Sequence, residues 1–580
     1  MKFLLAAINA KFIHSNPAIY SLAAFAQKRL PQYKNQIELS EYTINQPMHA
    51  VLSNLYFRRP DAVGFSCYIW NIEYVFRLVT ELKKILPDTE IWLGGPEVSY
   101  DAETILEAHP QIRGIMIGEG EETFTELLSY YANRKEESRL DKVSGIAFRN
   151  DLGRISFTEQ RPLAKISSIP FLYEDPKRFE NKIIYYESSR GCPFRCSYCL
   201  SSIDKQVRFR DLEIVKKELQ FFLDHKVKQV KFIDRTFNCS HEHAMTIWEY
   251  IRDHDNGTTN FHFEIAGDLL TEEELELIRT LRPGAVQMEI GVQSTNGRTI
   301  QEIERTMDKK KLAGVVKQLH ESGNVHIHLD LIAGLPYEDY ESFANSFNEV
   351  FAMKPEQLQL GFLKVLKGSK MYQNAEEYGL VYSDAPPYEV LFTKWISFEE
   401  IQKLKKIEEM VEIYYNSNQY RTTLPFLLRE FTHPFAFFEA LAAFYEKNHY
   451  FIMTPARAYR YEILLEFAKE YMPKKADLIR EMLVVDYYLR ENAKARPGFA
   501  KEGMKKEVRH EFYQKESVEH HYLTGEIYRG LSAKELSGIT HIEPINYDLH
   551  SGKKKKEQSY VLFDYQKRNP LTHEAKSWLA

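Results

Sequence analysis

The sequence predicts an α/β protein with a doubly wound parallel sheet at the N-terminus, a partial (β/α) barrel in the centre and a mostly α-helical C-terminal domain. Two observations support this fold class. Short apolar segments alternate with helical segments over residues 1–140 and again over residues 183–385, as in parallel sheets that helices cover on both faces. Residues 386–580 lose this alternation and interleave Tyr and Phe with Glu and Lys, which favours helices.

Four parts follow along the chain. The N-terminal domain takes residues 1–140, and a connector at 141–182 follows, in which three prolines interrupt any helical period. The barrel takes residues 183–385 and the helical domain residues 386–580. The lysines at 553–556 are predicted to form a solvated loop, with a nucleic-acid patch as the less favoured alternative. A length of 580 residues agrees with three to four domains at about 150 residues each.

Composition and charge exclude several classes of protein. Hydrophobic residues make up 44% and charged residues 27% of the chain, which is ordinary for a globular protein. The net charge of −6 gives no basic field that would recruit nucleic acid. The first apolar run is too short for a signal peptide, and no segment is long enough to span a bilayer. We therefore expect a cytoplasmic protein with neither a membrane nor a nucleic-acid partner.

Glycines follow two strands of the N-terminal domain. They are Gly94 and Gly95 after one strand and Gly118 and Gly120 after another, at the carboxyl ends where parallel sheets bind ligands. The Gly118-Glu119-Gly120 run is no dinucleotide fingerprint, because the third glycine is missing and the nearby glutamates repel a pyrophosphate. The predicted strands of this domain are 2–8, 36–42, 62–66, 90–93 and 114–117.

Three of the five cysteines lie in the stretch ESSRGCPFRCSYCLSS, at Cys192, Cys196 and Cys199. Five cysteines in a chain of this length form no disulfide framework, so their clustering indicates metal binding or catalysis. A structural zinc site needs four ligands, and Cys239 or a distant His could supply the fourth, so zinc remains an alternative. Three thiolates alone suit a [4Fe–4S] cluster that keeps one iron open to a substrate or cosubstrate.

The C-x3-C-x2-C spacing, with Tyr198 before its last cysteine, resembles the signature of the radical SAM superfamily. Three more segments are similar, in order, to strands of its coproporphyrinogen-dehydrogenase and methylthiotransferase type: F-x-D-x-x-F at 232–237, E-I-G-V-Q-S at 289–294 and D-L-I-x-G-L-P at 330–336. The resemblance implies that the three cysteines hold a [4Fe–4S] cluster and that S-adenosylmethionine (SAM) chelates its open iron. It also implies reductive cleavage of SAM to a 5′-deoxyadenosyl radical and an external electron donor of the flavodoxin or ferredoxin type.

Side-chain alternation on the central strands independently predicts a polar lumen. Apolar residues alternate with polar ones over 261–266, 286–293 and 326–331, so the polar ones share one face. Since an ordinary barrel fills its interior with branched apolar side chains, a polar interior indicates a cavity for SAM and a substrate. Two hypotheses apply to the paired histidines of 326–331: lumen hydrogen bonding or substrate contact, which we favour, and a second metal site. Candidates for the substrate cavity are His262, Glu264, His326, His328 and Asp330. Positions that the resemblance implies for SAM contact are Tyr198, Asp234, Glu289, Gln293 and Gly334.

The N-terminal domain resembles the cobalamin-binding domain that precedes many radical SAM cores. G-F-S at 64–66, G-G-P-E at 94–97 and G-E-G-E at 118–121 carry this resemblance. The domain lacks the D-x-H-x-x-G motif that gives cobalt a lower histidine ligand. This absence suggests that cobalamin is bound without that histidine. The alternative is that the domain binds no cobalamin. His14 could approach the corrin, cap the following helix or face solvent. Residues implied for cobalamin are His14, Ser66, Gly94, Gly95, Glu97, Gly118 and Gly120.

Together the two resemblances imply an enzyme that methylates an unactivated carbon. A cobalamin-dependent radical SAM cyclase or oxidoreductase without methyl transfer is the first alternative, and a zinc-binding protein without catalysis is the second. The C-terminal domain is expected to cover the barrel or bind substrate. The sequence identifies neither the substrate nor a catalytic side chain.

Overall fold

A computed structural model describes residues 1–133, 139–493 and 495–580, and its internal contacts divide the chain into two compact units. The first unit consists of Met1–Ser322, Gly334–Asp339 and Phe362–Ser397, and the second of Gly323–Ala333, Tyr340–Gly361 and Phe398–Ala580. None of the helices in the described part of the chain has the length and apolarity of a membrane span.

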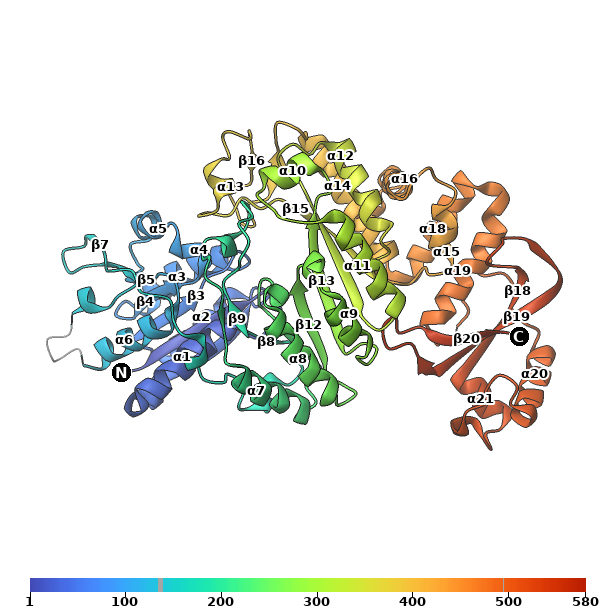
Figure 1. Ribbon diagram of the computed structural model, residues 1–580, viewed down its shortest axis with the longest axis horizontal. Helices are drawn as coiled ribbons and strands as arrows, with labels where there is room; N and C mark the ends of the chain where they lie inside the picture. Colours follow the sequence, from blue (N-terminus) through green and yellow to red (C-terminus); the bar gives the residue numbers. More distant parts are fainter. Residues whose placement is uncertain (134–138, 494) are drawn as a thin grey trace. The chain divides into compact units, whose positions relative to one another are not determined.

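The first unit begins with a seven-stranded sheet in the order β2-β1-β3-β4-β5-β6-β7. Its first five strands run parallel, and every residue of β1 is buried, as expected for a strand covered on both faces. Helices α1 and α6 cover one face, and α2 and α3 pack on the other (Figure 1). The elements are β1 (Phe3–Asn9), α1 (Pro17–Arg29), β2 (Ile37–Thr43), α2 (Met48–Arg58), β3 (Ala62–Ser66), α3 (Ile72–Ile85), β4 (Glu90–Gly94), β5 (Gly114–Met116) and α6 (Gly120–Ala132).

The predicted connector contributes to this sheet, which corrects the sequence analysis. Strands β6 (Ile146–Arg149) and β7 (Ile155–Phe157) extend the sheet in the antiparallel direction. Gly114 allows the close pairing of β5 with β6, because a Cβ there would lie 2.8 Å from the Ala147 carbonyl oxygen. The two strands are too short to show a side-chain period, and the prolines that suggested a connector all follow them.

Four parallel strands form the core that follows in the same unit, in the order β8-β11-β12-β13. The predicted alternation is confirmed on β13, where every second residue from Val286 to Val292 is buried. The predicted α/β architecture is therefore confirmed in both of its sheets. The elements are β8 (Ile184–Tyr186), α7 (Leu212–Asp224), β11 (Gln229–Phe232), α8 (His241–Asp253), β12 (Asn260–Ile265), α9 (Glu272–Arg279) and β13 (Val286–Gln293).

The second unit contains β14 (His326–Ala333), α12 (Tyr340–Phe351) and a largely helical region. Its principal helices are α14 (Phe398–Val411), α16 (Pro434–Lys447), α18 (Arg457–Tyr471), α19 (Ala476–Arg490) and α20 (Lys506–Glu519). After these helices the chain forms a three-stranded antiparallel sheet of β18 (Thr540–Tyr547), β19 (Lys554–Arg568) and β20 (Ala575–Leu579).

This small sheet corrects the prediction for the lysine run. Lys554 begins β19 and pairs with Tyr547, so the run enters a strand instead of forming a solvated loop. Identical side chains cannot show an alternation between two faces, and for this reason the sequence pattern did not reveal the strand.

Candidate functional site

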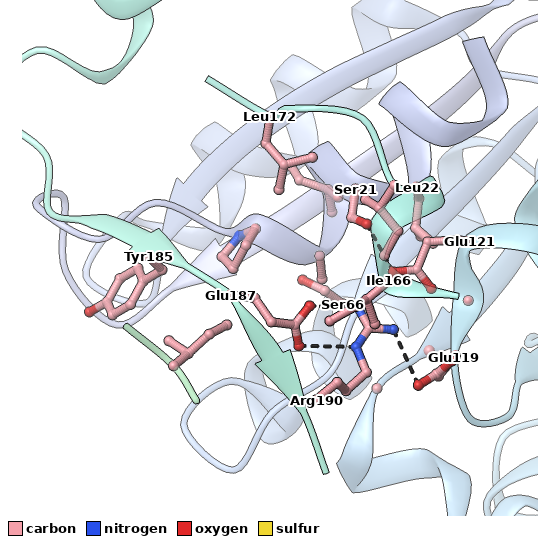
Figure 2. A pocket seen from close by; sticks show the side chains of 18 of the residues that line it. Ser21, Leu22, Ser66, Glu119, Glu121, Ile166, Leu172, Tyr185, Glu187 and Arg190 are labelled. Carbon is pink, nitrogen blue, oxygen red and sulfur yellow. Dashed lines mark hydrogen bonds and ion pairs between the residues drawn. The ribbon is translucent and has the colours of Figure 1, made fainter. Parts of the chain in front are cut away.

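A cavity of about 520 Å³ opens at the carboxyl ends of the strands in the N-terminal sheet (Figure 2). Five of the seven residues predicted to contact cobalamin line it: Ser66, Gly94, Gly95, Gly118 and Gly120. Two of these positions need glycine for different reasons. Gly95 has a φ of +112°, and a Cβ there would lie 2.5 Å from the Cys67 carbonyl oxygen. Gly118 has a φ of +77° with no atom within 4 Å of its Cβ position, so the cavity begins at its backbone.

The opposite wall of the cavity comes from the segment that leads into the core. Apolar and aromatic side chains dominate it, with Ile166, Tyr173 and Tyr185 among them, and Glu187 and Arg190 add charge. Glycine backbone on one wall and aromatic rings on the other fit a large, flat cofactor, because most ligand cavities are apolar with a few oriented polar groups.

His14 and Glu97 are not among the residues that line this cavity. The His14 Nδ1 atom lies 2.6 Å from the Tyr185 hydroxyl, and burial lowers the pKa of His14. Glu97 accepts a hydrogen bond of 2.8 Å from the Tyr388 hydroxyl. Contact of either residue with cobalamin therefore stays a prediction.

The three cysteines share one loop that a short ladder closes. Strand β9 (Ser189–Arg190) pairs antiparallel with β10 (Arg208–Phe209) at the base of this loop. Gly191 allows the closure, because a Cβ there would lie 2.2 Å from the Gln206 carbonyl oxygen.

The thiols of this loop fit the donor set of an iron–sulfur cluster. Cys192 and Cys196 are buried, Cys199 is half-buried, and none forms a disulfide. No three His, Cys, Asp or Glu side chains within residues 1–133, 139–493 and 495–580 are grouped as ligands of one metal ion. In a cluster each thiolate binds its own iron, so its thiolates need not converge on one point.

Arg305, which the sequence analysis missed, places a positive charge beside this cysteine loop. Its Nη1 atom lies 3.6 Å from the Cys196 sulfur and 3.4 Å from the Tyr198 hydroxyl, and its Nη2 donates to the Gly291 carbonyl oxygen. Burial raises the pKa of the Cys196 thiol, and the Arg305 charge opposes that effect. Arg305 therefore favours the thiolate form that binds iron. No motif marks position 305, since its partners come from distant segments.

Asp234 anchors the start of the cysteine loop. Its side chain is fully buried and accepts hydrogen bonds from the Ser188 amide at 2.8 Å, the Ser188 hydroxyl at 2.5 Å and the Ser189 hydroxyl at 2.7 Å. Burial raises the pKa of Asp234 to about 6, against these hydrogen bonds. The structure gives Asp234 a positioning role, and its predicted contact with SAM stays a prediction.

The polar face of the core strands carries a charged cluster. Glu289 lies 3.0 Å from the Lys231 Nζ atom and 3.0 Å from the His262 Nε2 atom. The nearby His262 imidazole, together with the Lys231 charge, lowers the pKa of Glu289 to about 2. Burial raises the pKa of Glu264, which lies 4.0 Å from Lys231. The sequence analysis missed Lys231, although the alternation in β11 places it on the polar face.

Two further residues predicted to contact SAM end strands in unusual backbone conformations. Gln293 ends β13 with a φ of +71°. The nitrogen of its side-chain amide lies 2.2 Å from the position that a Cβ on Gly291 would take. Gly334 has a φ of +86° and packs against Val390. Both shape turns at strand ends, and SAM contact stays a prediction for them, for Glu289 and for Tyr198.

The remaining substrate-cavity candidates lie on β14 in the second unit. The His328 Nε2 and His326 Nδ1 atoms are 2.9 Å apart, so the two rings share a hydrogen bond. This geometry favours the hydrogen-bonding hypothesis over a second metal site. Asp330 follows them on the same strand.

Comparison with known proteins agrees with this geometry. The family described as B12 binding domain matches residues 4–128, and the radical SAM superfamily matches residues 186–350. A family of proteins of unknown function, DUF4080, matches residues 376–563. The chain belongs to the cobalamin-dependent radical SAM family. Membership implies a [4Fe–4S] cluster, SAM and cobalamin as the cofactors of this radical SAM enzyme.

Relatives of this radical SAM enzyme are distant. The cobalamin-dependent radical SAM methyltransferase TokK of Streptomyces tokunonensis is 24% identical over 55% of this chain and 50% of that protein. The anaerobic magnesium-protoporphyrin IX monomethyl ester cyclase of Synechocystis sp. is 29% identical over 40% of this chain and 47% of that protein. The chain thus spans about half the length of these relatives.

A solved structure supports the fold of this radical SAM enzyme. The cobalamin-dependent S-adenosylmethionine radical enzyme OxsB, with aqua-cobalamin and S-adenosylmethionine bound, superposes with a TM-score of 0.57. The match covers 83% of this chain and 78% of that chain at 15% identity.

Proposed function

We propose that this enzyme methylates an unactivated carbon of its substrate. Arg190 supports the proposal most directly, because it lines the cavity on the cobalamin-binding domain and stands two residues before Cys192. Methyl transfer to carbon needs the methyl donor and the radical source beside one substrate, and reactants held together gain several orders of magnitude in rate. The relatives are mostly methyltransferases, which adds support.

The proposed roles of this chain's residues follow from their contacts. Cys192, Cys196 and Cys199 would hold the cluster, and Arg305 would offset the negative charge of the thiolates. When bound, the cluster with SAM supplies hydrogen abstraction and cobalamin supplies the methyl group; the protein supplies binding and orientation. The aromatic wall of the cavity would exclude water from the reacting groups.

Substrate binding is proposed for the polar face of the core. Lys231, His262 and Glu264 offer a cation, a neutral imidazole and a half-buried carboxyl within one cluster. A substrate with several polar groups suits this set better than a purely apolar one, because buried polar groups need partners. The electron for SAM cleavage is proposed to come from an external donor of the flavodoxin or ferredoxin type.

Ring closure without methyl transfer is the second candidate function. The cyclase of Synechocystis sp. has 29% identity, above the 24% of TokK, over a shorter segment. A cyclase consumes no methyl group, so the two candidates differ in their products.

Labelled SAM distinguishes the two functions. The purified enzyme is incubated anaerobically with trideuteromethyl SAM, reductant, hydroxocobalamin and a metabolite extract. Methyl transfer predicts that 5′-deoxyadenosine and S-adenosylhomocysteine form together and that one extract component gains the label. Deoxyadenosine without S-adenosylhomocysteine favours the cyclase. The control variant Cys196→Ala should form neither product, and reductive SAM cleavage by this variant would contradict the cluster assignment.

A further inference from the structure

Two arginines at the base of the cysteine loop are held by carboxylates, two of which lie where the chain passes from β5 into α6. Arg190 and Arg208 face each other across the β9–β10 ladder, where their like charges would repel. Glu119 stands between them, at 2.6 Å and 3.1 Å from the Arg208 guanidinium and 3.3 Å from Arg190 Nη1. This two-point contact orients the Arg208 guanidinium and also offsets its positive charge.

Glu121 provides a second carboxylate. It lies 3.0 Å from Arg190 Nη2 and accepts a 2.9 Å hydrogen bond from the Ser21 hydroxyl of α1, and it is only 5% exposed. Glu187 completes the set with hydrogen bonds of 2.7 Å and 3.0 Å from Arg190. Figure 2 shows Arg190 with dashed lines to Glu187 and Glu119. Arg190 is thus bound from both sides of the cavity.

These ion pairs are poorly screened by solvent. The side chains of Arg190, Arg208 and Glu119 are 20%, 17% and 18% exposed. Burial alone would raise the pKa of Glu119, but Arg208 and Arg190 outweigh it and hold the pKa below its ordinary value. Removal of one partner from such a half-buried network leaves a poorly compensated charge, which is destabilising.

The segment 118–121, which leads into α6, makes contacts in two directions. Its glycines line the cavity with backbone, while its glutamates reach the arginines below the cysteines. Gly118 holds a positive φ with open space beside it, so a ligand can pack directly on its backbone. A ligand packed against Gly118 and Gly120 restrains the same segment that holds Arg190.

We propose that Arg190 and Glu119 are positioning residues that link cobalamin binding in the cavity to the placement of the cysteine loop, so that cobalamin and the cluster bind cooperatively. The first ligand bound restrains the shared segment, so the second ligand loses less conformational entropy on binding. The linkage holds for methyl transfer and for ring closure alike. It also gives the G-E-G-E segment a function in which its glutamates bind protein arginines.

Cobalamin affinity tests the linkage without any measurement of turnover. The dissociation constant of hydroxocobalamin is measured by equilibrium dialysis for the cluster-loaded protein and for the cluster-free protein. We expect about tenfold tighter binding to the cluster-loaded form, within the usual range of coupling between sites. The coupling is reciprocal, so cobalamin should reduce the amount of cluster iron that a chelator removes at equilibrium.

Arg190→Met should reduce the ratio of the two dissociation constants to about one, because the shared contact is gone. Arg161→Met is the matched control: Arg161 pairs with Glu122 and Glu126 of the same helix, and its variant should keep the wild-type ratio. Glu119→Gln and Glu121→Gln keep the side-chain shape and should give intermediate ratios, which secures the test if Arg190→Met does not fold.

Two results would overturn the linkage. One is a wild-type ratio of one, and the other is an unchanged tenfold ratio in Arg190→Met. If both dissociation constants of that variant rise by the same factor, the ratio is unchanged and Arg190 is a direct cobalamin contact with no coupling. A ratio that falls in Arg190→Met and persists in Arg161→Met supports the proposal.

Discussion

The Arg305 guanidinium lies 3.6 Å from the Cys196 sulfur, and its other amino group is fixed by the Gly291 carbonyl oxygen at the end of β13. A cation is therefore held beside one of the three thiols by the strand that also carries Glu289 and Gln293. The charge around a cluster and the hydrogen bonds to its sulfurs set its reduction potential. This contact connects the fold of the core to the redox behaviour of the cluster.

Arg305→Met should make the cluster harder to reduce. Loss of a nearby positive charge disfavours the added electron, and the potential should fall by on the order of tens of millivolts, since a tenfold change for one electron is about 59 mV. Electron paramagnetic resonance during a redox titration measures the shift. Arg305→Lys keeps the charge without the fork to Gly291 and should shift the potential less. An unchanged potential in Arg305→Met contradicts this role.

Asp234→Asn should destabilise the protein and lower its cluster content. One oxygen of Asp234 accepts from both serine hydroxyls and the other from the Ser188 amide. Asn has a single oxygen and cannot accept all three bonds, and an unsatisfied buried group costs about 1–3 kcal/mol. Thermal unfolding and iron content after anaerobic reconstitution measure the two effects. Asp253→Asn is the control, because Asp253 is 54% exposed and should change stability by less than about 0.5 kcal/mol. Normal stability with weakened SAM binding in Asp234→Asn instead favours direct SAM contact.

Lys231 and Glu289 should show energetic coupling. Lys231→Met leaves Glu264 and Glu289 without their shared cation and should lower the free energy of unfolding. Glu289→Gln in the same chain should recover part of this lost stability. We expect a coupling free energy of about 1–3 kcal/mol from the double-mutant cycle, as for residues in one network. Chemical denaturation of the four proteins measures it. The more exposed pair Lys216 and Glu213 should couple by less than about 1 kcal/mol, and equal values for both pairs would reject the cluster.

The parts of the site that the sequence predicted are those that it carries locally. The three cysteines lie within one loop, and the glycines that line the cavity follow apolar strands, so spacing and strand ends were sufficient to find them. The polar face of β13 followed from its period of two.

The parts that the sequence could not predict depend on distant partners. Arg305 meets Cys196 across 109 positions of the chain, and Arg208 meets Glu119 across 89. The sequence around an arginine does not show whether its side chain forms a buried ion pair or is solvated. Strands β6 and β7 escaped for another reason: segments of four and three residues are too short for a period to show.

Asp486 should make stability fall as pH rises from about 4 to about 7. This carboxyl is fully buried and accepts from the Thr422 and Thr423 amides at 2.7 Å and 2.8 Å. Burial raises the pKa of Asp486 from 3.8 to about 6, against these hydrogen bonds. A folded-state pKa above the unfolded value favours the folded state below pH 3.8, and this contribution is lost as pH passes about 6.

The size of this effect follows from the shift, and is about 3 kcal/mol at 1.36 kcal/mol per pKa unit. Asp486→Asn should remove that part of the pH dependence, measured by denaturant unfolding at about pH 4 and about pH 7. Asp477→Asn, an exposed aspartate of the same helix, should leave the difference between the two pH values close to wild type. The same pH dependence in Asp486→Asn as in the wild type would assign it to other groups.

Two glycines of the cavity should respond differently to alanine. Both have a positive φ, so each variant loses about 1–2 kcal/mol from the backbone conformation. Gly95→Ala also places its Cβ 2.5 Å from the Cys67 carbonyl oxygen, so we expect a larger loss of stability even without cobalamin.

Gly118→Ala meets no atom within 4 Å, and its methyl group points into the space that cobalamin is expected to fill. Its main effect should be weaker cobalamin binding, measured by dialysis beside a thermal unfolding curve of the cobalamin-free protein. Gly153→Ala, with a φ of +75° and the same open surroundings but outside the cavity, should lose similar stability and keep wild-type affinity. If Gly118→Ala also keeps wild-type affinity, the cofactor does not contact this part of the cavity.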